Sequence, residues 1–368
     1  MKMSGRRQRP PADSGRQHGR IPRALLVLVL VLLAADASGC GDGATSASKK
    51  TVGFVVAYKG ATFADEMALG FSAGVADIGG VTSLVTGPPI SNGPQQVQMF
   101  QKLVKQAAGG VSVETLSPEL FARPMASAVK AGLPVIAVDT PPSVATDVKL
   151  YIGNDNYALG QSLADVVINR LPTGASGTVI LGTSAPGVPV LDSRAQGITD
   201  EFKAKRPKVR VLGPFDTSQD IPANQVAWSG LVRANPKALA FLGTGEADAF
   251  NLAAVRERVH GRWLAGAFDL NPKSLAAVMR GELIAVVSPE HYLKGMVAGR
   301  IQAERVTRGN RLPTGWIVIP GSTVTAANVA EIEQRQSSPA AKRAWAQPKA
   351  IALLKNLKNV RRSLSDAR

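Results

Sequence analysis

The stretch Thr51-Val52-Gly53-Phe54-Val55-Val56-Ala57 decides the fold of this chain. Its residues are small, apolar or β-branched throughout, a pattern typical of a strand buried on both faces of a parallel sheet. A segment with helical periodicity, residues 64–78, follows directly. A buried strand followed at once by a helix is the opening unit of an alternating α/β fold.

The same alternation continues along the chain. After the first unit we predict strands at residues 81–86, 111–116 and 134–139, with helices at 95–107 and 118–131. Beyond Tyr151-Ile152-Gly153 the alternation restarts, with strands at 178–181, 209–212, 238–242 and 263–268 and helices at 157–171, 192–205, 223–233 and 247–259. The later helices 272–280 and 292–308 and strands 284–288 and 316–319 complete the two sheets. The pattern predicts two doubly wound, Rossmann-like lobes.

Length and charge agree with two lobes and argue against nucleic acid as a partner. Without its first 40 residues the chain keeps 328 of 368, which suits two lobes of about 150 residues each. The formal charge of +16 is concentrated at the ends, because residues 1–40 carry +5 and residues 331–368 carry +6. The aromatic content of 5% offers little surface for base stacking.

The N-terminus predicts export. Twelve small or apolar residues, 24–35, follow seven basic residues, and this run is too short to span a bilayer. Ala37-Ser38-Gly39-Cys40 comes next and resembles the lipobox of bacterial lipoproteins, in which the cysteine is acylated. We therefore expect a signal peptide at residues 1–39, lipidation at Cys40 and a flexible tether at 40–50. An ordinary cleaved signal or an N-terminal anchor with an incidental cysteine is the alternative. No disulfide can form, since Cys40 is the sole cysteine.

The alternating body resembles the ribose-type (type I) periplasmic sugar-binding proteins. The resemblance is carried by the first strand with Phe63 and Gly70, by Pro134-Val135-Ile136-Ala137-Val138-Asp139, and most specifically by the phrase from Ile152 to Gly160. Ser193-Arg194-Ala195-Gln196-Gly197, Phe268-Asp269 and Val287-Ser288-Pro289-Glu290 follow in the family's order. It covers residues 51–330.

The resemblance implies two lobes joined by a hinge of three crossovers and closing on one small ligand. We expect the crossovers near Asn154, near Ser288 and at residues 311–315. The N-terminal lobe would then comprise residues 51–153 plus 289–311, and the C-terminal lobe residues 154–288 plus 312–333. The remaining residues, 334–368, read as a basic linker followed by an amphipathic helix from about residue 351. That helix would contact anionic lipid head groups, or would pack loosely on the body or extend without order.

Candidate ligand-binding residues follow the ends of predicted strands, where open α/β sheets bind their ligands. Carboxylates and amides can pair with adjacent hydroxyls, an arginine can donate several hydrogen bonds, and aromatic rings can cover the apolar face of a sugar. The candidates are Tyr58, Phe63, Asp139, Asn154, Asp155, Arg194, Thr244, Asp248, Phe268, Asp269, Ser288 and Glu290. Between Thr244, Glu246 and Asp248 the sequence does not decide which faces the cleft.

Three departures from the ribose-type pattern shift the expected ligand. Ala64 and Thr140 stand where the family usually has an aromatic residue and an arginine, and Ser288-Pro289-Glu290 stands where it often has a glutamine. We therefore expect another monosaccharide or a polyol rather than ribose. The three histidines, His18, His260 and His291, are isolated in sequence, so we predict no metal site, no cofactor and no enzyme. We read His291 as a helix cap or a residue at the cleft rim.

The sequence thus predicts a monomeric, lipid-anchored substrate-binding protein on the outer face of the cell membrane. Its partners would be a sugar or polyol and the membrane permease of an ABC importer. A ligand sensor for a membrane receptor and a nucleoside-binding lipoprotein of the same fold remain alternatives, with an exported hydrolase a distant further one.

Overall fold

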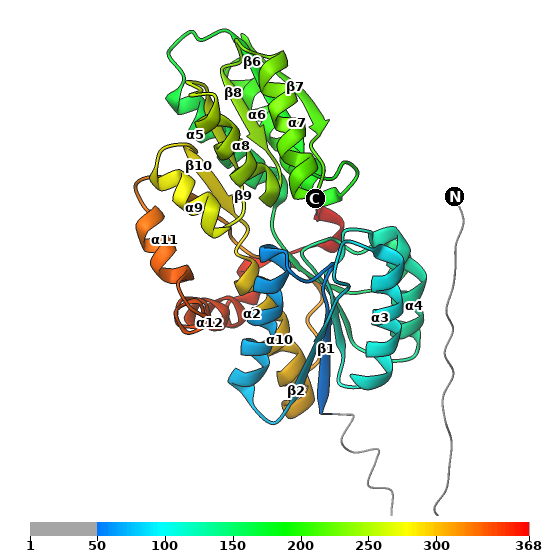
Figure 1. Ribbon diagram of the computed structural model, residues 1–368. Coiled ribbons are helices and arrows are strands. Elements are labelled where there is room, and N and C mark those ends of the chain that lie inside the picture. Colours follow the sequence, from blue (N-terminus) through cyan, green and yellow to red (C-terminus); the bar gives the residue numbers. More distant parts are fainter. Residues whose placement is uncertain (1–49, 368) are drawn as a thin grey trace, which may run out of the picture. The chain divides into compact units, whose positions relative to one another are not determined.

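The computed structural model describes residues 50–367 and contains two sheets (Figure 1). The predicted signal peptide, Cys40 and nearly all of the tether lie outside the described residues. The first sheet runs in the order β13-β11-β5-β4-β3-β1-β2, and only β13 is antiparallel to its neighbour. Its strands are β1 (Thr51–Val55), β2 (Thr82–Thr86), β3 (Val111–Val113), β4 (Val135–Val138), β5 (Leu150–Gly153), β11 (Gly315–Val318) and β13 (Arg361–Arg362).

Helices cover both faces of this sheet, as the apolar first strand requires. Phe54 faces α2 and α10, whereas the next residue, Val55, faces α3 and α4. The elements of this lobe are α2 (Thr62–Ile78), α3 (Gly93–Gln106), α4 (Ala122–Lys130), α10 (His291–Arg308), α12 (Pro339–Lys355) and α13 (Leu357–Val360), with 3-10 turns η1 (Pro118–Phe121), η2 (Val144–Thr146) and η3 (Leu364–Asp366).

The second sheet runs in the order β12-β10-β9-β8-β6-β7, and only β12 is antiparallel to its neighbour. The fold is therefore α/β with two doubly wound lobes, as the sequence predicts. The strands are β6 (Gly177–Thr183), β7 (Val209–Asp216), β8 (Ala240–Gly243), β9 (Leu264–Phe268), β10 (Ala285–Ser288) and β12 (Ser322–Val324), and the helices are α5 (Asn156–Arg170), α6 (Pro189–Lys205), α7 (Ile221–Ala234), α8 (Glu246–Arg258), α9 (Pro272–Met279) and α11 (Val329–Gln336).

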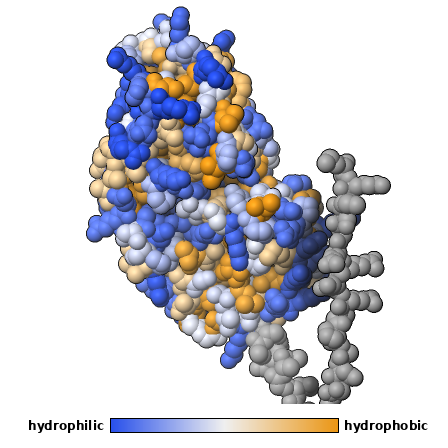
Figure 2. All heavy atoms as spheres, viewed as in Figure 1, coloured by the Kyte–Doolittle hydropathy of each residue, from blue (hydrophilic) through white to orange (hydrophobic). Residues whose placement is uncertain are grey.

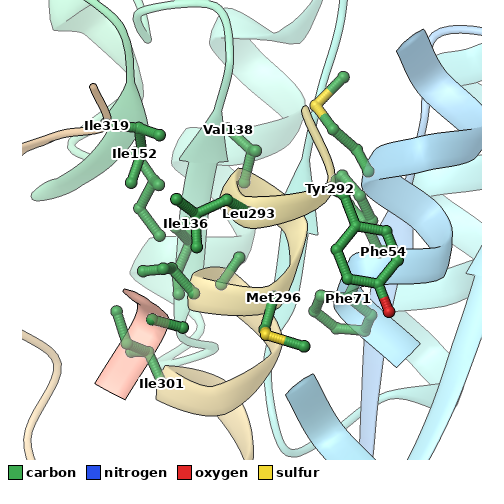
Figure 3. Packing of buried hydrophobic residues seen from close by; sticks show 14 of the residues in the cluster. Phe54, Phe71, Ile136, Val138, Ile152, Tyr292, Leu293, Met296, Ile301 and Ile319 are labelled. Carbon is green, nitrogen blue, oxygen red and sulfur yellow. The ribbon is translucent and has the colours of Figure 1, made fainter. Parts of the chain in front are cut away.

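Glycines let α2 and α10 pack backbone to backbone. A Cβ atom on Gly70 would lie 2.0 Å from the carbonyl oxygen of Tyr292, and one on Gly295 would lie 2.0 Å from that of Met67. Around this contact Phe54, Phe71, Tyr292 and Met296 form one side of the core (Figure 3). Such close approach fixes α10 firmly against the sheet.

The third crossover lies later in the chain than the sequence predicts. Residues 311–315 do not lead into the second lobe, because β11 pairs in parallel with β5 in the first sheet. Trp316 of β11 stacks on Tyr151 of β5, with ring centroids 5.9 Å apart. The chain crosses over only after Ile319. The segment 312–333, predicted to belong to the C-terminal lobe, therefore wrongly includes β11 and correctly includes β12 and α11.

The C-terminal region 334–368 is not a linker, which corrects a second expectation. Residues 339–355 form α12, which begins well before residue 351 and buries Ala346 and Ala350 in the first lobe's core. Lys342 pairs with Glu66 at 2.6 Å, Arg343 pairs with Asp77, and β13 adds an edge to the first sheet. The tail is therefore part of the folded body and packs its apolar side on protein.

Substitution of Ala350 tests this packing. Lysine at residue 350 would place a charge in the core and should lower the free energy of unfolding by about 2–4 kcal/mol. The matched control is Ala352→Lys in the same helix, because Ala352 is exposed and both changes keep a good helix former. Chemical denaturation measures both. Equal stability of the two variants would contradict a packed tail.

Candidate ligand-binding cleft

A cavity of about 690 Å³ lies where strand ends of the two sheets meet. Both lobes supply its wall, so it has the position and size of a small-molecule site. The lining residues are Tyr58, Lys59, Gly60, Ala61, Phe63, Pro89, Ile90, Ser91, Leu116, Asp139, Ser184, Val190, Leu191, Arg194, Gln219, Asp220, Ile221, Pro222, Gly245, Glu246, Ala247, Phe250, Asp269 and His291.

One aspartate from each lobe reaches the cavity. Asp139 follows β4 and Asp269 follows β9, and both have left-handed backbones with φ of 66° and 76°. This conformation is uncommon for residues other than glycine and is held here by backbone bonds from Asp139 N to Ile152 O and from Asp269 N to Val287 O. The strained turns place both carboxylates on the cavity floor, as the sequence predicts.

The first turn of α10 supplies the partners of these aspartates. Lys294, fully buried, donates to Asp139 Oδ1 and, at 2.7 Å, to Asn154 Oδ1. His291 Nε2 lies 2.8 Å from Asp269 Oδ1, and its Nδ1 lies 3.9 Å from Asp139 Oδ1. Among the described residues Nδ1 has no hydrogen-bond partner. His291 therefore stands between the two carboxylates, with one ring nitrogen buried and without a hydrogen-bond partner among the described residues.

Arg194 forms the second-lobe side of the floor. Its Nε donates to Asn156 Oδ1 at 3.0 Å and its Nη1 to the carbonyl of Thr244 at 2.8 Å, while the guanidinium lies 4.4 Å from the centre of the Phe268 ring. Nη1 also lies 3.9 Å from Asp269 Oδ2. These contacts hold the guanidinium in one orientation at the cavity wall.

The family-like phrases of the sequence explain how Arg194 is placed. A Cβ on Gly160 would lie 2.2 Å from the carbonyl oxygen of Arg194, and one on Gly197 would lie 2.1 Å from that of Tyr157. These two glycines let α5 and α6 touch backbone to backbone. Arg194 thus lies at a helix contact in which neither Gly160 nor Gly197 can be replaced by a larger residue.

Burial and neighbouring charges set the ionisation of the floor. Burial raises the pKa of Asp139, but the nearby Lys294, His291 and Arg194 outweigh it and hold the pKa at about 2. Burial lowers the pKa of Lys294. Burial and the Asp139 charge raise the pKa of Glu114, which is fully buried behind the floor, to about 8. With Glu114 protonated, the charges of the two aspartates are matched by those of Arg194 and Lys294.

An aromatic wall adjoins the floor. Tyr58 and Phe63 meet edge to face with centroids 5.7 Å apart, and Phe63 lies 5.8 Å from the His291 ring. Burial and Glu246 raise the pKa of Tyr58, so its hydroxyl stays protonated. The ring faces suit the apolar side of a sugar, and the hydroxyl can donate to it.

Contacts between the lobes surround the cavity. Glu246 Oε2 accepts from the backbone N–H of Phe63 at 3.3 Å, and its Oε1 accepts from Asn271 at 2.8 Å. Asn271 also donates to Thr62 of the first lobe at 3.1 Å. Of the three residues that the sequence left undecided, Glu246 is the one that lines the cavity.

Asn154, which from its place in the first crossover could contact ligand or tie the crossover down, does not line the cavity and ties the hinge together. It is fully buried, and its amide nitrogen donates to Pro289 O at 3.0 Å and to Ile319 O at 2.8 Å. These carbonyls belong to the second and third crossovers, whereas Asn154 belongs to the first. A single side chain therefore joins all three connections.

Six further candidates lie outside the main cavity. Asp155 caps α5 and pairs with Arg362, Asp248 accepts bonds from the side chains of Thr217, Asn224 and Trp228, and Glu290 pairs with Arg335. Thr244 bonds Thr183 and Phe268 lies under Arg194. Ser288 lines only a minor void beside the cavity. For the five acids and hydroxyls the reason is shared, because such a group at a strand end also satisfies backbone and buried polar groups, whereas Phe268 packs against Arg194.

Sequence reasoning placed His291 only at a helix cap or the cleft rim, and it did not single out Lys294 or Glu114. His291 and Lys294 are one turn apart at the start of a helix that follows the hinge, and this position could have identified them from the sequence. Glu114 follows a buried strand just as Asp139 does, so the same rule could have found it. The described residues hold no group of three His, Cys, Asp or Glu side chains able to bind a metal ion. Within that part of the chain, no helix has the length and apolar character needed to span a bilayer.

Fold and site together define a two-lobed α/β solute-binding protein. The family model for the periplasmic binding protein domain matches residues 52–306, and the chain belongs to that family. The family consists of solute-binding proteins rather than enzymes, which confirms the prediction of no enzyme, and membership implies export.

Relatives of known name share only part of the sequence. The chain is 23% identical over 234 residues to a xylose/arabinose-binding protein, XylF, of Sulfolobus acidocaldarius, spanning 58% of this chain but only 55% of that relative. It is 24% identical over 272 residues to the fructose import binding protein FruE of Bifidobacterium longum, with 70% and 80% covered. A solute-binding protein of an ABC transporter from Burkholderia graminis, solved with D-arabinose, matches with a TM-score of 0.70 and 23% identity, covering 77% of this chain and 97% of that one.

Glu114 should make the stability of the protein fall as pH rises. Its pKa rises from 4.5 to about 8 on folding, so the folded state binds the proton more tightly than the unfolded state. The folded state therefore loses stability relative to the unfolded state as the pH rises from about 4.5 to about 8. Glu114→Gln keeps an acceptor for the Ala57 N–H and removes the titration. Between about pH 5 and pH 8 we expect the free energy of unfolding of the variant to rise relative to that of the wild type by a few kcal/mol. Denaturation across this range measures the difference, with exposed Glu119→Gln as control. A constant difference would contradict the burial argument.

Proposed function

We propose that this protein is the lipid-anchored substrate-binding component of an ABC importer, and that it binds a monosaccharide or polyol between its lobes. The observation that carries the proposal is the convergence of Asp139 and Asp269, one from each lobe, on a cavity floor completed by Arg194 and His291. Carboxylates can accept from neighbouring hydroxyls, and the guanidinium and imidazole can donate to them. A ligand held from both lobes favours the closed form that a permease would receive.

The charge balance supports an uncharged, hydroxylated ligand. Asp139 is paired with Lys294, and Asp269 lies 3.9 Å from Arg194 and contacts His291, so neither of these two carboxylates is left unpaired for a cationic ligand. Three relatives have names or titles that mention sugars: xylose and arabinose, fructose, and bound D-arabinose. The departures from the ribose-type pattern fit a sugar other than ribose.

Binding tests separate the cavity residues from the hinge residues. A thermal-shift and calorimetry panel of pentoses, hexoses, polyols, nucleosides and amino acids should show stabilisation by a sugar or polyol. Asp269→Asn should then lower the affinity for that ligand ten-fold or more, because a hydrogen bond to a carboxylate contributes about 1.5–3 kcal/mol. Asp155→Asn is the matched control, since it lies outside the cavity and asparagine also caps helices. No stabilisation by any sugar or polyol, or equal losses in both variants, would refute the proposal.

Lipid anchoring rests on the sequence around Cys40. In a bacterial host, the full chain should incorporate a labelled fatty acid and sediment with membranes. Cys40→Ser should lose both the label and the sedimentation, because a serine hydroxyl does not replace the thiol in this modification. A wild-type chain that stays unlabelled and soluble would refute the anchor and leave the ligand proposal untouched.

A further inference from the structure

The cavity has two chemically different halves. Its floor carries the aspartates, Arg194, His291 and the aromatic wall described above. The rest of its lining, here called the outer half, is mainly apolar and comes from both lobes: Pro89, Ile90, Ile221 and Pro222 are exposed, Leu116 is half-buried, and Val190, Leu191 and Phe250 are buried. A free monosaccharide bears hydroxyls on nearly every carbon, so one of its ends would meet side chains that cannot form hydrogen bonds.

Two isoleucines of this outer half stand on opposite lobes and are open to solvent. Ile90, in the loop between β2 and α3, is 68% exposed, and Ile221, at the start of α7, is 53% exposed. Single exposed apolar residues are ordinary on protein surfaces, and Figure 2 shows many of them scattered over the visible face. Two that line one cavity from different lobes indicate a place where an apolar group of a ligand could bind.

The two lobes touch directly at one apolar cluster beside the cavity. Leu116 of the first lobe packs against the buried Val188, Val190 and Leu191 of the second lobe. Ile90 and Ile221 are not part of this cluster, although they line the same cavity. The lobes therefore already touch while the two isoleucines stay uncovered.

Polar groups of the outer half are few and partly occupied. The Asp220 carboxylate accepts from the Ala223 N–H at 2.9 Å and caps α7, and Glu246 is bonded to Asn271 and Phe63. Lys59, Ser91, Ser184 and Gln219 complete the polar lining. The cavity lining as a whole exposes more apolar than polar surface.

We infer that the ligand is a sugar carrying an apolar substituent, such as an alkyl or aryl glycoside. The hydroxylated ring occupies the floor, and the substituent lies between Ile90 and Ile221, whose exposed surface it covers. This inference rests on the proposed sugar-binding function and narrows it to glycosides.

Paired ligands test the inference. The probes are the methyl, n-butyl and phenyl glycosides, in both anomers, of the sugars D-glucose, D-galactose, D-xylose and D-arabinose, with the free sugars beside them. We expect at least one n-butyl or phenyl glycoside to bind ten-fold or more tightly than its methyl counterpart. Free sugars that bind as tightly as every glycoside would overturn the inference and leave sugar binding intact. No binding by any probe would overturn the proposed function as well.

Variants show where the substituent lies. Ile90→Ser and Ile221→Ser should each weaken the preferred butyl or phenyl glycoside three-fold or more and leave the methyl glycoside unchanged. Val226→Ser is the matched control, since Val226 is 72% exposed on α7 but does not line the cavity, and it should alter neither ligand. Equal losses for both ligands would mean that the isoleucines serve closure alone, and this result would overturn the inference.

Discussion

The side chain of Asn154 is the contact on which the arrangement of the two lobes depends. Its amide nitrogen holds the carbonyls of Pro289 and Ile319, and its amide oxygen accepts from Lys294. Every connection between the lobes thus meets at one buried group, whose donors and acceptor are all used. Because an unpaired buried amide is costly, the three crossovers are held together more strongly than any single bond implies.

Hinge and ligand floor are the same hydrogen-bonded network. Lys294 contacts Asn154 on one side and Asp139 on the other, and one turn earlier His291 contacts Asp269. Close packing of α10 on α2, through Gly70 and Gly295, sets where these side chains project. A ligand that contacts Asp139, as we propose, would therefore act on a group whose partner Lys294 also bonds the hinge.

The sequence predicted the features that depend on a local residue pattern and missed those that depend on contacts between residues far apart in the chain. The run from Thr51 to Ala57 predicted a strand buried on both faces, and the strand-end rule found Asp139 and Asp269. The same rule also selected Asp248, which is spent on neighbouring side chains that only the fold brings near. The place of β11 was decided by stacking of Trp316 on Tyr151, a contact 165 residues apart in the chain, which no local pattern encodes.

The C-terminal region braces the hinge from outside. Arg335 of α11 pairs with Glu290 at 2.9 Å, beside the second crossover, and Arg362 pairs with Asp155 at 2.7 Å, beside the first. Between these two bonds α12 is anchored in the first lobe's core. Glu290 and Arg335 are both buried, and losing one partner of a buried pair leaves an uncompensated charge. Breaking this pair would therefore cost free energy, and we expect a closing motion of the lobes to leave it intact.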